Sequence, residues 1–331
     1  MGYCVKNTFV KLLLAGVLVV KTPDLLSQGY YFYDNGTYEP SWVVDGSFNL
    51  GIMNSVTDIG GSKKATQGLN ATTLRSSNLS AGLSLTATYR DWFAVRVDVT
   101  TGRISGADSL LKDADYFSAI GRFERNLSFR TSINEVFIGV EIHPLYLRSY
   151  NSDRPLPRFS PYIVAGIGGL RFNPQANIDN RWVDLKPLRL EGQGFAEYPD
   201  RRQYTGNATI FPLGAGIKFE LSRNIILRGE IIRRTTNSDY LDDVSKGDWV
   251  DPLLFFNYLS PNDAVLASRL YNRSTVINPP RNTRPRGSDS NNDLYWNAQI
   301  RLGIALNRRG TNPQFGKRSS VRCKPIPGAF K

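Results

Sequence analysis

One stretch near the end of the chain, residues 294–306, constrains the fold more than any other. A period of two in hydrophobicity is typical of a strand with one apolar and one polar face. This strand is roughly twice the usual five or six residues, and a tilted strand crosses a bilayer in about nine to eleven. The pattern therefore predicts one membrane-spanning strand of a transmembrane β-barrel. The alternating apolar residues are Leu294, Trp296, Ala298, Ile300, Leu302, Ile304 and Leu306.

Seven further segments alternate in the same way, although apolar residues on both faces blur the fifth strand. The connections after the first, third, fifth and seventh strands are long, and the others are shorter. This rhythm is typical of bacterial outer-membrane barrels with both termini in the periplasm. We therefore predict an all-β fold, an eight-stranded antiparallel transmembrane β-barrel with long outer loops and short periplasmic turns. The seven segments are residues 42–52, 79–90, 93–100, 135–143, 159–172, 211–220 and 225–234.

The start of the chain predicts export. Residues 9–20 form a short apolar run that follows Lys6, as in a secretory signal peptide. No apolar run reaches the roughly eighteen residues of a membrane-spanning helix. The expected organisation is a signal peptide over 1–27, a periplasmic lead over 28–41, the barrel over 42–307 and a basic tail over 308–331. Cys323 would be the sole cysteine after cleavage, which excludes an internal disulfide in the mature chain.

Positive charge is concentrated in the tail, which carries no acidic residue although the whole chain has a formal net charge of +12. Such clusters favour anionic partners. We expect outer-membrane lipid, lipopolysaccharide or an acidic periplasmic protein, and no nucleic acid because the chain is exported. A merely solubilising tail is the alternative. The candidate docking residues are Arg308, Arg309, Lys317, Arg318, Arg322 and Lys324.

Several motifs recur in one order from the fifth strand onward. They include residues 158–162, 165–169, 182–188, 191–194, 211–218 and 239–245. Together they resemble an outer-membrane β-barrel family of Bacteroidota, related to porin and OmpA-like barrels. The resemblance implies a non-enzymatic barrel. Some members of that family serve the type IX secretion and gliding machinery, beside a periplasmic ring that contains a lipoprotein. Unlike OmpA, this chain has no room for a peptidoglycan-binding domain after the last strand.

The inward-facing positions collect charges of both signs. Eight strands enclose an interior that side chains just fill, and an unpaired buried charge costs several kcal/mol. A salt-bridged plug is therefore favoured over a narrow charged pore. The predicted lumen network comprises Arg96, Asp98, Glu135, Glu141, Lys218, Glu220, Arg228, Glu230, Arg234 and Arg301.

Two further groups of residues are candidates for chemistry. His143 is the only histidine, and its place at the periplasmic rim favours a structural role over catalysis. Carboxylates after the seventh strand are a weak candidate for a cation-binding loop, with a solvated acidic turn as the alternative. They are Asp239, Asp242, Asp243, Asp248 and Asp251. Later in the same loop, Ser260 and Pro261 predict the start of a short helix.

The sequence thus predicts no enzyme, no cofactor and no metal centre beyond that loop. Two classes of function remain open. The first is a structural or docking component of an envelope assembly such as the type IX secretion or gliding machinery. The second is a small-solute porin, or a surface-binding barrel that acts through its extracellular loops.

Overall fold

The computed structural model describes residues 41–61, 76–112, 117–149, 159–222, 224–274, 285–289 and 292–308. The predicted signal peptide, the lead up to residue 40 and the tail after Arg308 lie outside these residues. The strands are β1 (Trp42–Val56), β2 (Asn78–Tyr89), β3 (Phe93–Ala107), β4 (Ser128–Ile142), β5 (Phe159–Ile178), β6 (Arg181–Asp184), β7 (Asn207–Glu220), β8 (Ile225–Thr236) and β9 (Leu294–Ala305). The helical segments are η4 (Asp108–Leu111), α3 (Phe117–Arg125), α4 (Pro144–Ser149), η5 (Lys186–Leu188), α5 (Leu254–Tyr258) and α6 (Pro261–Leu270).

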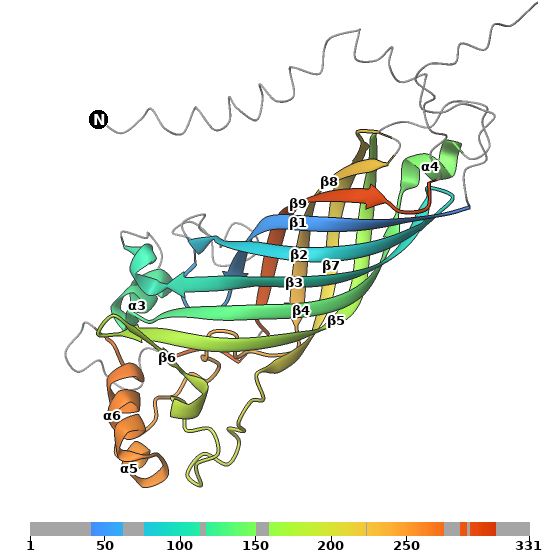
Figure 1. Ribbon diagram of the computed structural model, residues 1–331. Coiled ribbons are helices and arrows are strands. Elements are labelled where there is room, and N and C mark those ends of the chain that lie inside the picture. The colour runs from blue at the N-terminus through green and yellow to red at the C-terminus, as the bar shows by residue number, and fades with distance from the viewer. Residues whose placement is uncertain are drawn as a thin grey trace, which may run out of the picture.

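Eight of the strands form a closed antiparallel barrel, as predicted (Figure 1). The sheet runs β4-β3-β2-β1-β9-β8-β7-β5, and the pairing of β4 with β5 closes it. The short β6 adds only a hairpin to the outer part of β5. Closure satisfies every strand edge, which is the condition for strands to cross a bilayer. Among the described residues, no helix combines the length and apolar character needed to span a membrane.

Alternation assigns the two faces of the wall. On β9, Ile300 is 62% exposed and faces outward, whereas Asn297 is fully buried inside. The same rule places Leu83, Ile138 and Leu213 on an outward apolar belt. An apolar belt around the whole barrel suits lipid rather than water. Trp296 shares the outward parity of Ile300 but is only 8% exposed.

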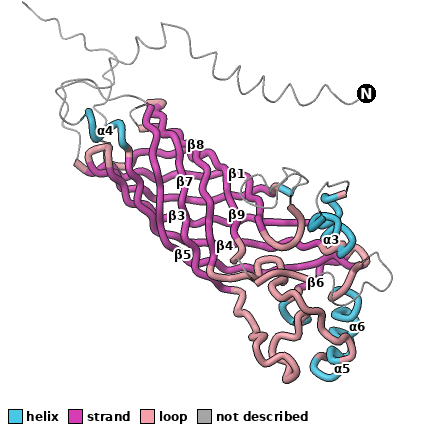
Figure 2. The backbone as a smooth tube through the Cα atoms, turned by 180° about the vertical axis from the view of Figure 1, so that it is seen from behind, coloured by secondary structure: helices cyan, strands magenta, loops and turns pink. Residues whose placement is uncertain are grey.

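The two ends of the barrel differ (Figures 1 and 2). At the end we call the turn end, β2 joins β3 through Arg90 and Asp91, whose φ values of 43° and 62° are left-handed. The opposite, loop end carries α3, α5 and α6 and the long connections. The β4–β5 connection at the turn end includes α4.

The strands extend further toward the loop end than the apolar alternation predicted. β1 continues to Val56 and β5 to Ile178, and β3 and β4 pair as far as Ala107 and Ser128. The prediction failed because these outer segments leave the apolar belt. Their outward residues are polar, so the pattern fades while the hydrogen-bonded ladder continues. The helix predicted after Ser260 was confirmed, with Ser260 Oγ accepting a hydrogen bond from the Asp263 amide at 3.3 Å.

Candidate functional site: a charged lumen under a loop cap

The middle of the lumen is an ion-paired layer built from four strands. Arg96 of β3 lies 2.8 Å from Glu141 of β4 and 2.7 Å from Glu230 of β8. Arg301 of β9 contacts the same two carboxylates at 3.1 and 3.4 Å. Asp98 adds a third carboxylate 2.9 Å from Arg96. Because Arg96 and Arg301 pair with carboxylates on other strands, the layer ties the barrel together across its axis.

A second set of pairs lies nearer the turn end. Arg228 meets Asp45 in a bidentate pair, with two contacts of 2.8 Å. Lys218 lies 3.0 Å from Glu220, and Arg308 reaches Glu220 at 3.2 Å. Fork-to-fork arginine–carboxylate contacts of this kind are strong and fix geometry. The turn end of the lumen is therefore occupied by paired side chains.

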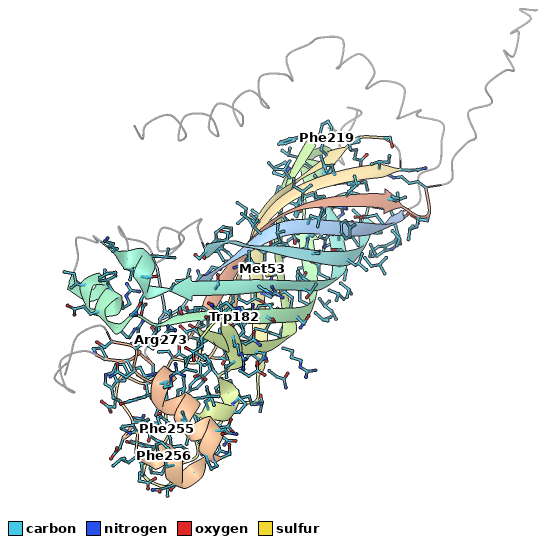
Figure 3. The ribbon with its side chains drawn as sticks, turned by 60° about the vertical axis from the view of Figure 1, so that its left-hand side comes forward. Met53, Trp182, Phe219, Phe255, Phe256 and Arg273 are labelled. Atoms are coloured by element: carbon cyan, nitrogen blue, oxygen red, sulfur yellow. The ribbon has the colours of Figure 1, made fainter. Side chains whose placement is uncertain are left out.

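Toward the loop end the lumen becomes apolar. Arg234 lies 2.7 Å from Glu135, to which the Tyr295 hydroxyl donates a hydrogen bond. Around and beyond that pair, strand residues pack with loop residues in one buried cluster, which we call the apolar layer. Its members are Met53, Ile59, Ile104, Leu127, Phe129, Ile133, Phe137, Val164, Leu170, Phe172, Ile210, Ile232, Leu241, Val244 and Tyr295. Figure 3 shows Met53 within the barrel.

The structure places all ten predicted lumen residues inside the barrel, none more than 7% exposed. Sequence reasoning missed three polar residues that complete the network. Asp45 could have been found from its inward parity on the first strand. The hydroxyl of Tyr162 and the amide of Gln299 both donate hydrogen bonds to Glu230. The apolar layer was also missed, since its inward apolar residues look like noise in the alternation of β5.

Loop residues close the loop end, and we call them the loop cap: residues 57–61, 108–112, 117–127, 179–206, 237–274, 285–289 and 292–293. Buried carboxylates hold its segments together. Asp108 pairs with Arg125 at 2.8 Å and accepts a hydrogen bond from the Gly60 amide at 2.9 Å. Glu191 pairs with Arg286 at 2.6 Å and accepts one from the Ser245 amide at 3.0 Å. These bonds fasten loops that are distant in sequence into one folded unit.

An outlying part of the loop cap has an apolar core of its own. Residues from η5, α5, α6 and the segment after η5 bury their side chains together, including Leu188, Phe195, Phe255 and Leu270. The rings of Phe195 and Tyr258 stack with centroids 4.2 Å apart. We call this part the loop module. It projects away from the barrel at the end opposite Phe219 (Figure 3).

The candidate cation loop does not gather into a site. The Asp242 carboxylate accepts hydrogen bonds from the amides of Ile59 and Val244, at 2.9 and 3.0 Å. Asp243 accepts one from the Tyr204 hydroxyl at 2.6 Å. The side chain of Asp248 is 95% exposed, 3.9 Å from Arg201.

Asp251 instead accepts a hydrogen bond from the Leu253 amide at 3.0 Å. The remaining member, Asp239, is partly buried beside the Asp242 carboxylate. Within the described residues, no three acidic, histidine or cysteine side chains are arranged to hold a metal ion. The five aspartates of the predicted cation loop are therefore not gathered into one site, because Asp242, Asp243 and Asp251 accept hydrogen bonds from different partners while Asp248 is exposed.

Burial shifts the pKa of these carboxyls upward. It raises the pKa of Asp242 to about 8, assisted by the nearby charge of Asp58. The pKa of Asp239 rises to about 8, chiefly through burial and the charge of Asp242. Burial raises the pKa of Asp243 to about 7, against the opposing pull of Arg286. Asp293, also buried beside Asp242, has its pKa raised as well. The carboxyl groups of Asp239, Asp242 and Asp243 in the loop cap therefore change protonation state near neutral pH.

His143 lies at the turn end in a buried polar pocket. Its Nδ1 is 3.3 Å from Ser160 Oγ and its Nε2 is 3.4 Å from the Glu141 carboxylate. Serine, histidine and carboxylate in this order are the parts of a hydrolase triad. Here, however, Ser160 is fully buried and Glu141 is engaged by two arginines. No substrate carbonyl can approach Ser160 in this arrangement, so the geometry favours a structural histidine.

The first residue of the predicted docking tail belongs to the barrel. Arg308 is 6% exposed and pairs with Glu220. Next to it, the Asn307 side chain donates to the Trp42 carbonyl at 2.6 Å and accepts from the Val44 amide at 2.9 Å. Arg308 was therefore wrongly assigned to a free tail: it follows the end of β9 at Ala305, and its buried side chain pairs with Glu220 of β7. The other candidate docking residues lie outside the described part of the chain.

Comparison with known proteins finds similar folds but no sequence match. No family model matches this chain, and no curated protein matches its sequence. The chain is similar to the N-terminal β-barrel domain of Pseudomonas aeruginosa OprF, with 9% identity over 80% of this chain and 98% of that one, at a TM-score of 0.31. It is similar to Neisserial surface protein A, with 7% identity over 81% and 98%, at a TM-score of 0.33.

The outer membrane protein OprG from Pseudomonas aeruginosa is a third example, with 9% identity over 80% of this chain and 95% of that one, at a TM-score of 0.32. Likenesses this distant concern the fold alone and do not bear on substrate or partner. Nor do they bear on the Bacteroidota family or on type IX secretion, which rest on the sequence resemblance.

Proposed function

We propose that this protein is a non-conducting outer-membrane barrel that acts by binding, with its loop module on the cell surface. The orientation follows from the predicted export and from the general rule that outer-membrane barrels keep short turns in the periplasm and long loops outside. In this proposal the barrel anchors the protein in the membrane, and the loop cap carries the binding surface. Outer-membrane lipid and lipopolysaccharide surround its wall.

The observation that carries this proposal is the filling of the lumen. Arg96, Arg234 and Arg301 are each fully buried, as are the carboxylates of Glu141 and Asp98. The apolar layer extends from these charges toward the loop end, and the loop cap closes the barrel at that end. A hydrated ion would have to break several buried ion pairs to pass, at a cost of several kcal/mol for each charge left unpaired. This arrangement supports a plug over a small-solute pore.

The surface of the loop module supports a binding role. Phe255 is fully buried, whereas Phe256 beside it is 55% exposed and Leu253 is 70% exposed. Val265 on the adjoining α6 is 48% exposed. Figure 3 shows Phe256 at the tip of the molecule. Large apolar side chains at an exposed tip are a feature of interaction surfaces.

A second role, at the periplasmic end, is docking of a periplasmic assembly, such as the type IX secretion or gliding machinery with its lipoprotein partner. The sequence resemblance and the positive charge after Arg308 support it. Crosslinking in native membranes followed by purification of the barrel would test it. Recovery of a periplasmic lipoprotein from the wild type but not from a chain lacking residues 309–331 is the expected result. Recovery of no periplasmic protein would contradict the docking role.

Planar-bilayer recording tests the main proposal. The purified barrel, shown to be inserted by a faster gel mobility before boiling than after, should give no discrete conductance steps at neutral pH. Uniform steps would contradict the proposal. The variant Glu135→Gln serves as a check on their origin, because Glu135 lines the lumen beside Arg234. A change in ion selectivity in that variant would show that current passes through the lumen.

A further inference from the structure

Three neighbouring strands carry an outward-facing arginine just beyond the apolar belt, on the side of the loop end. They are Arg103 on β3, Arg130 on β4 and Arg171 on β5, and we call them the arginine face. Arg103 is in register with Ser132, two residues from Arg130 on the same face of β4. Arg171 is in register with Asn134. The three side chains therefore lie on one continuous part of the outer wall.

These arginines have no counterion in the described chain. No described carboxylate forms an ion pair with Arg103, Arg130 or Arg171, while the buried arginines of the lumen are all paired. Partial burial and the positive charge of Arg103 lower the pKa of Arg130. The nearby acid, Asp184, accepts hydrogen bonds from the amide side chains of β5 instead, at 2.9 and 2.7 Å.

Arg130 is held in place rather than free. Its guanidinium lies 3.8 Å from the ring centroid of Trp182 on β6. Its Nε donates a hydrogen bond to Gln175 Oε1 at 2.9 Å. Trp182 lies where the barrel wall meets the loop cap (Figure 3). Stacking and hydrogen bonding at one edge leave the remaining N–H groups of the guanidinium directed at the surroundings, and they fit the oxygens of a phosphate.

An apolar groove adjoins the arginine face on the side of the belt. Its volume is about 850 Å³, and it crosses the outer wall beneath Arg171. Leu83, Val99 and Val136 line it, and Gly169 and Ala208 also border it. Apolar walls below a row of cations match an amphiphile with an anionic head and hydrocarbon chains.

We propose that the arginine face binds the phosphate groups of the glycolipid of the outer leaflet, with an acyl chain in the groove. The assignment of the leaflet rests on the orientation given under the proposed function. A second copy of this chain is disfavoured as occupant, because it would bring arginines against arginines. A soluble protein is disfavoured because the groove lies within the apolar belt. Charge complementarity therefore favours a phosphorylated lipid.

Native mass spectrometry of the purified full-length barrel tests this assignment. The probes are lipid A with its phosphates, the same lipid A after removal of the phosphates, and phosphatidylglycerol. The wild type should retain phosphorylated lipid A and bind the dephosphorylated form at least tenfold more weakly, because each surface cation contributes appreciably to anionic-lipid binding. The double variant R103Q/R171Q should lose binding of phosphorylated lipid A to a similar degree.

A matched control is K246Q/R269Q, which removes two positive charges from the loop cap away from the arginine face. Those residues form partly exposed or exposed ion pairs with Asp289 and Asp179, so the control should bind lipid A as the wild type does. Faster gel mobility before boiling verifies that each variant is folded. Equal binding of dephosphorylated lipid A, equal binding by R103Q/R171Q, or equally tight binding of phosphatidylglycerol would each overturn the assignment to the outer-leaflet glycolipid.

Discussion

Replacing Arg96 by glutamine measures how much the charged lumen stabilises the barrel. Arg96 is fully buried and lies within 2.9 Å of Asp98, Glu141 and Glu230. At an effective dielectric constant of about 20, two charges about 4 Å apart attract by about 4 kcal/mol, so three contacts would total about 12 kcal/mol. Removing the cation also removes the cost of burying it, so the net loss is smaller. Breaking a buried pair costs about 3–5 kcal/mol in practice.

We therefore expect Arg96→Gln to lower the free energy of unfolding by about 3–5 kcal/mol. The assay is a urea titration in detergent micelles, followed by tryptophan fluorescence and by gel mobility without boiling. Arg103→Gln is the matched control, since Arg103 lies on the same strand but faces outward and forms no ion pair with a described carboxylate. Its effect should stay below about 1 kcal/mol.

A double-mutant cycle identifies the cause of the loss. Arg96→Gln combined with Glu230→Gln should cost less than the sum of the single changes, by about 1–3 kcal/mol, because the two residues share one network. If Arg96→Gln were no more destabilising than Arg103→Gln, the lumen charges would not hold the strands together. Strict additivity of the two lumen changes would refute the direct pairing of Arg96 with Glu230.

Other perturbations probe the wall, the loop cap and the tail. Ile300→Arg should reduce assembly into vesicles more than Asn297→Arg, because an arginine facing lipid near mid-membrane costs about 2–4 kcal/mol; equal yields would mean that the faces are misassigned. Raising the pH through about 7 to 8 should loosen the loop cap, because Asp243 and Asp242 have raised pKa values there. The ordinary pKa of these carboxyls is 3.8, so the stabilisation is full below about pH 4 and is lost progressively as the pH rises to the folded pKa values of about 7 and about 8. Hydrogen exchange of the loop cap, corrected for the intrinsic rate, should therefore accelerate between about pH 4 and about pH 8 and level off above that, and Asp242→Asn should reduce the change. Deleting residues 309–331 should leave the gel mobility shift intact but lower recovery of periplasmic partners in a salt-dependent way; undiminished recovery would exclude the tail as the docking element.

The barrel was predictable from sequence because the alternation of its strand residues can be recognised from neighbouring positions alone. A period of two needs only neighbouring residues, and lipid on one side makes that period clean, as Ile300 and Asn297 illustrate. Prediction failed where the solvent on the outer face changes from lipid to water. β5 continues past Phe172 to Ile178 although its outward residues there include Asn173 and Gln175. Hydrophobicity cannot mark the end of a strand that leaves the membrane.

The loop cap was not predictable because its contacts are long-range. The Ser288 amide donates to Asp58 at 2.7 Å, and the Ile59 amide donates to Asp242 at 2.9 Å. Each bond joins residues separated by most of the barrel, and no periodicity connects them. Read locally, Asp242 looks like a member of a solvated acidic turn or a cation loop. Only the folded arrangement shows that it binds backbone amides.

The charged layer has a consequence for how the strands choose their register. Shifting one strand by one residue moves all its side chains to the other face. A slip of β3 would turn Arg96 toward lipid, where it costs about 2–4 kcal/mol, and would leave Arg301 as the one arginine of the layer paired with Glu141 and Glu230. The same slip would bring Val95 or Val97 beside the carboxylates of the charged layer, where an aliphatic side chain can replace no ion pair. A wall of alternating aliphatic residues alone would tolerate such slips more readily, because serine, threonine and glycine fit either face. The buried ion pairs thus penalise every slip by an odd number of residues twice, once in the lipid and once in the lumen.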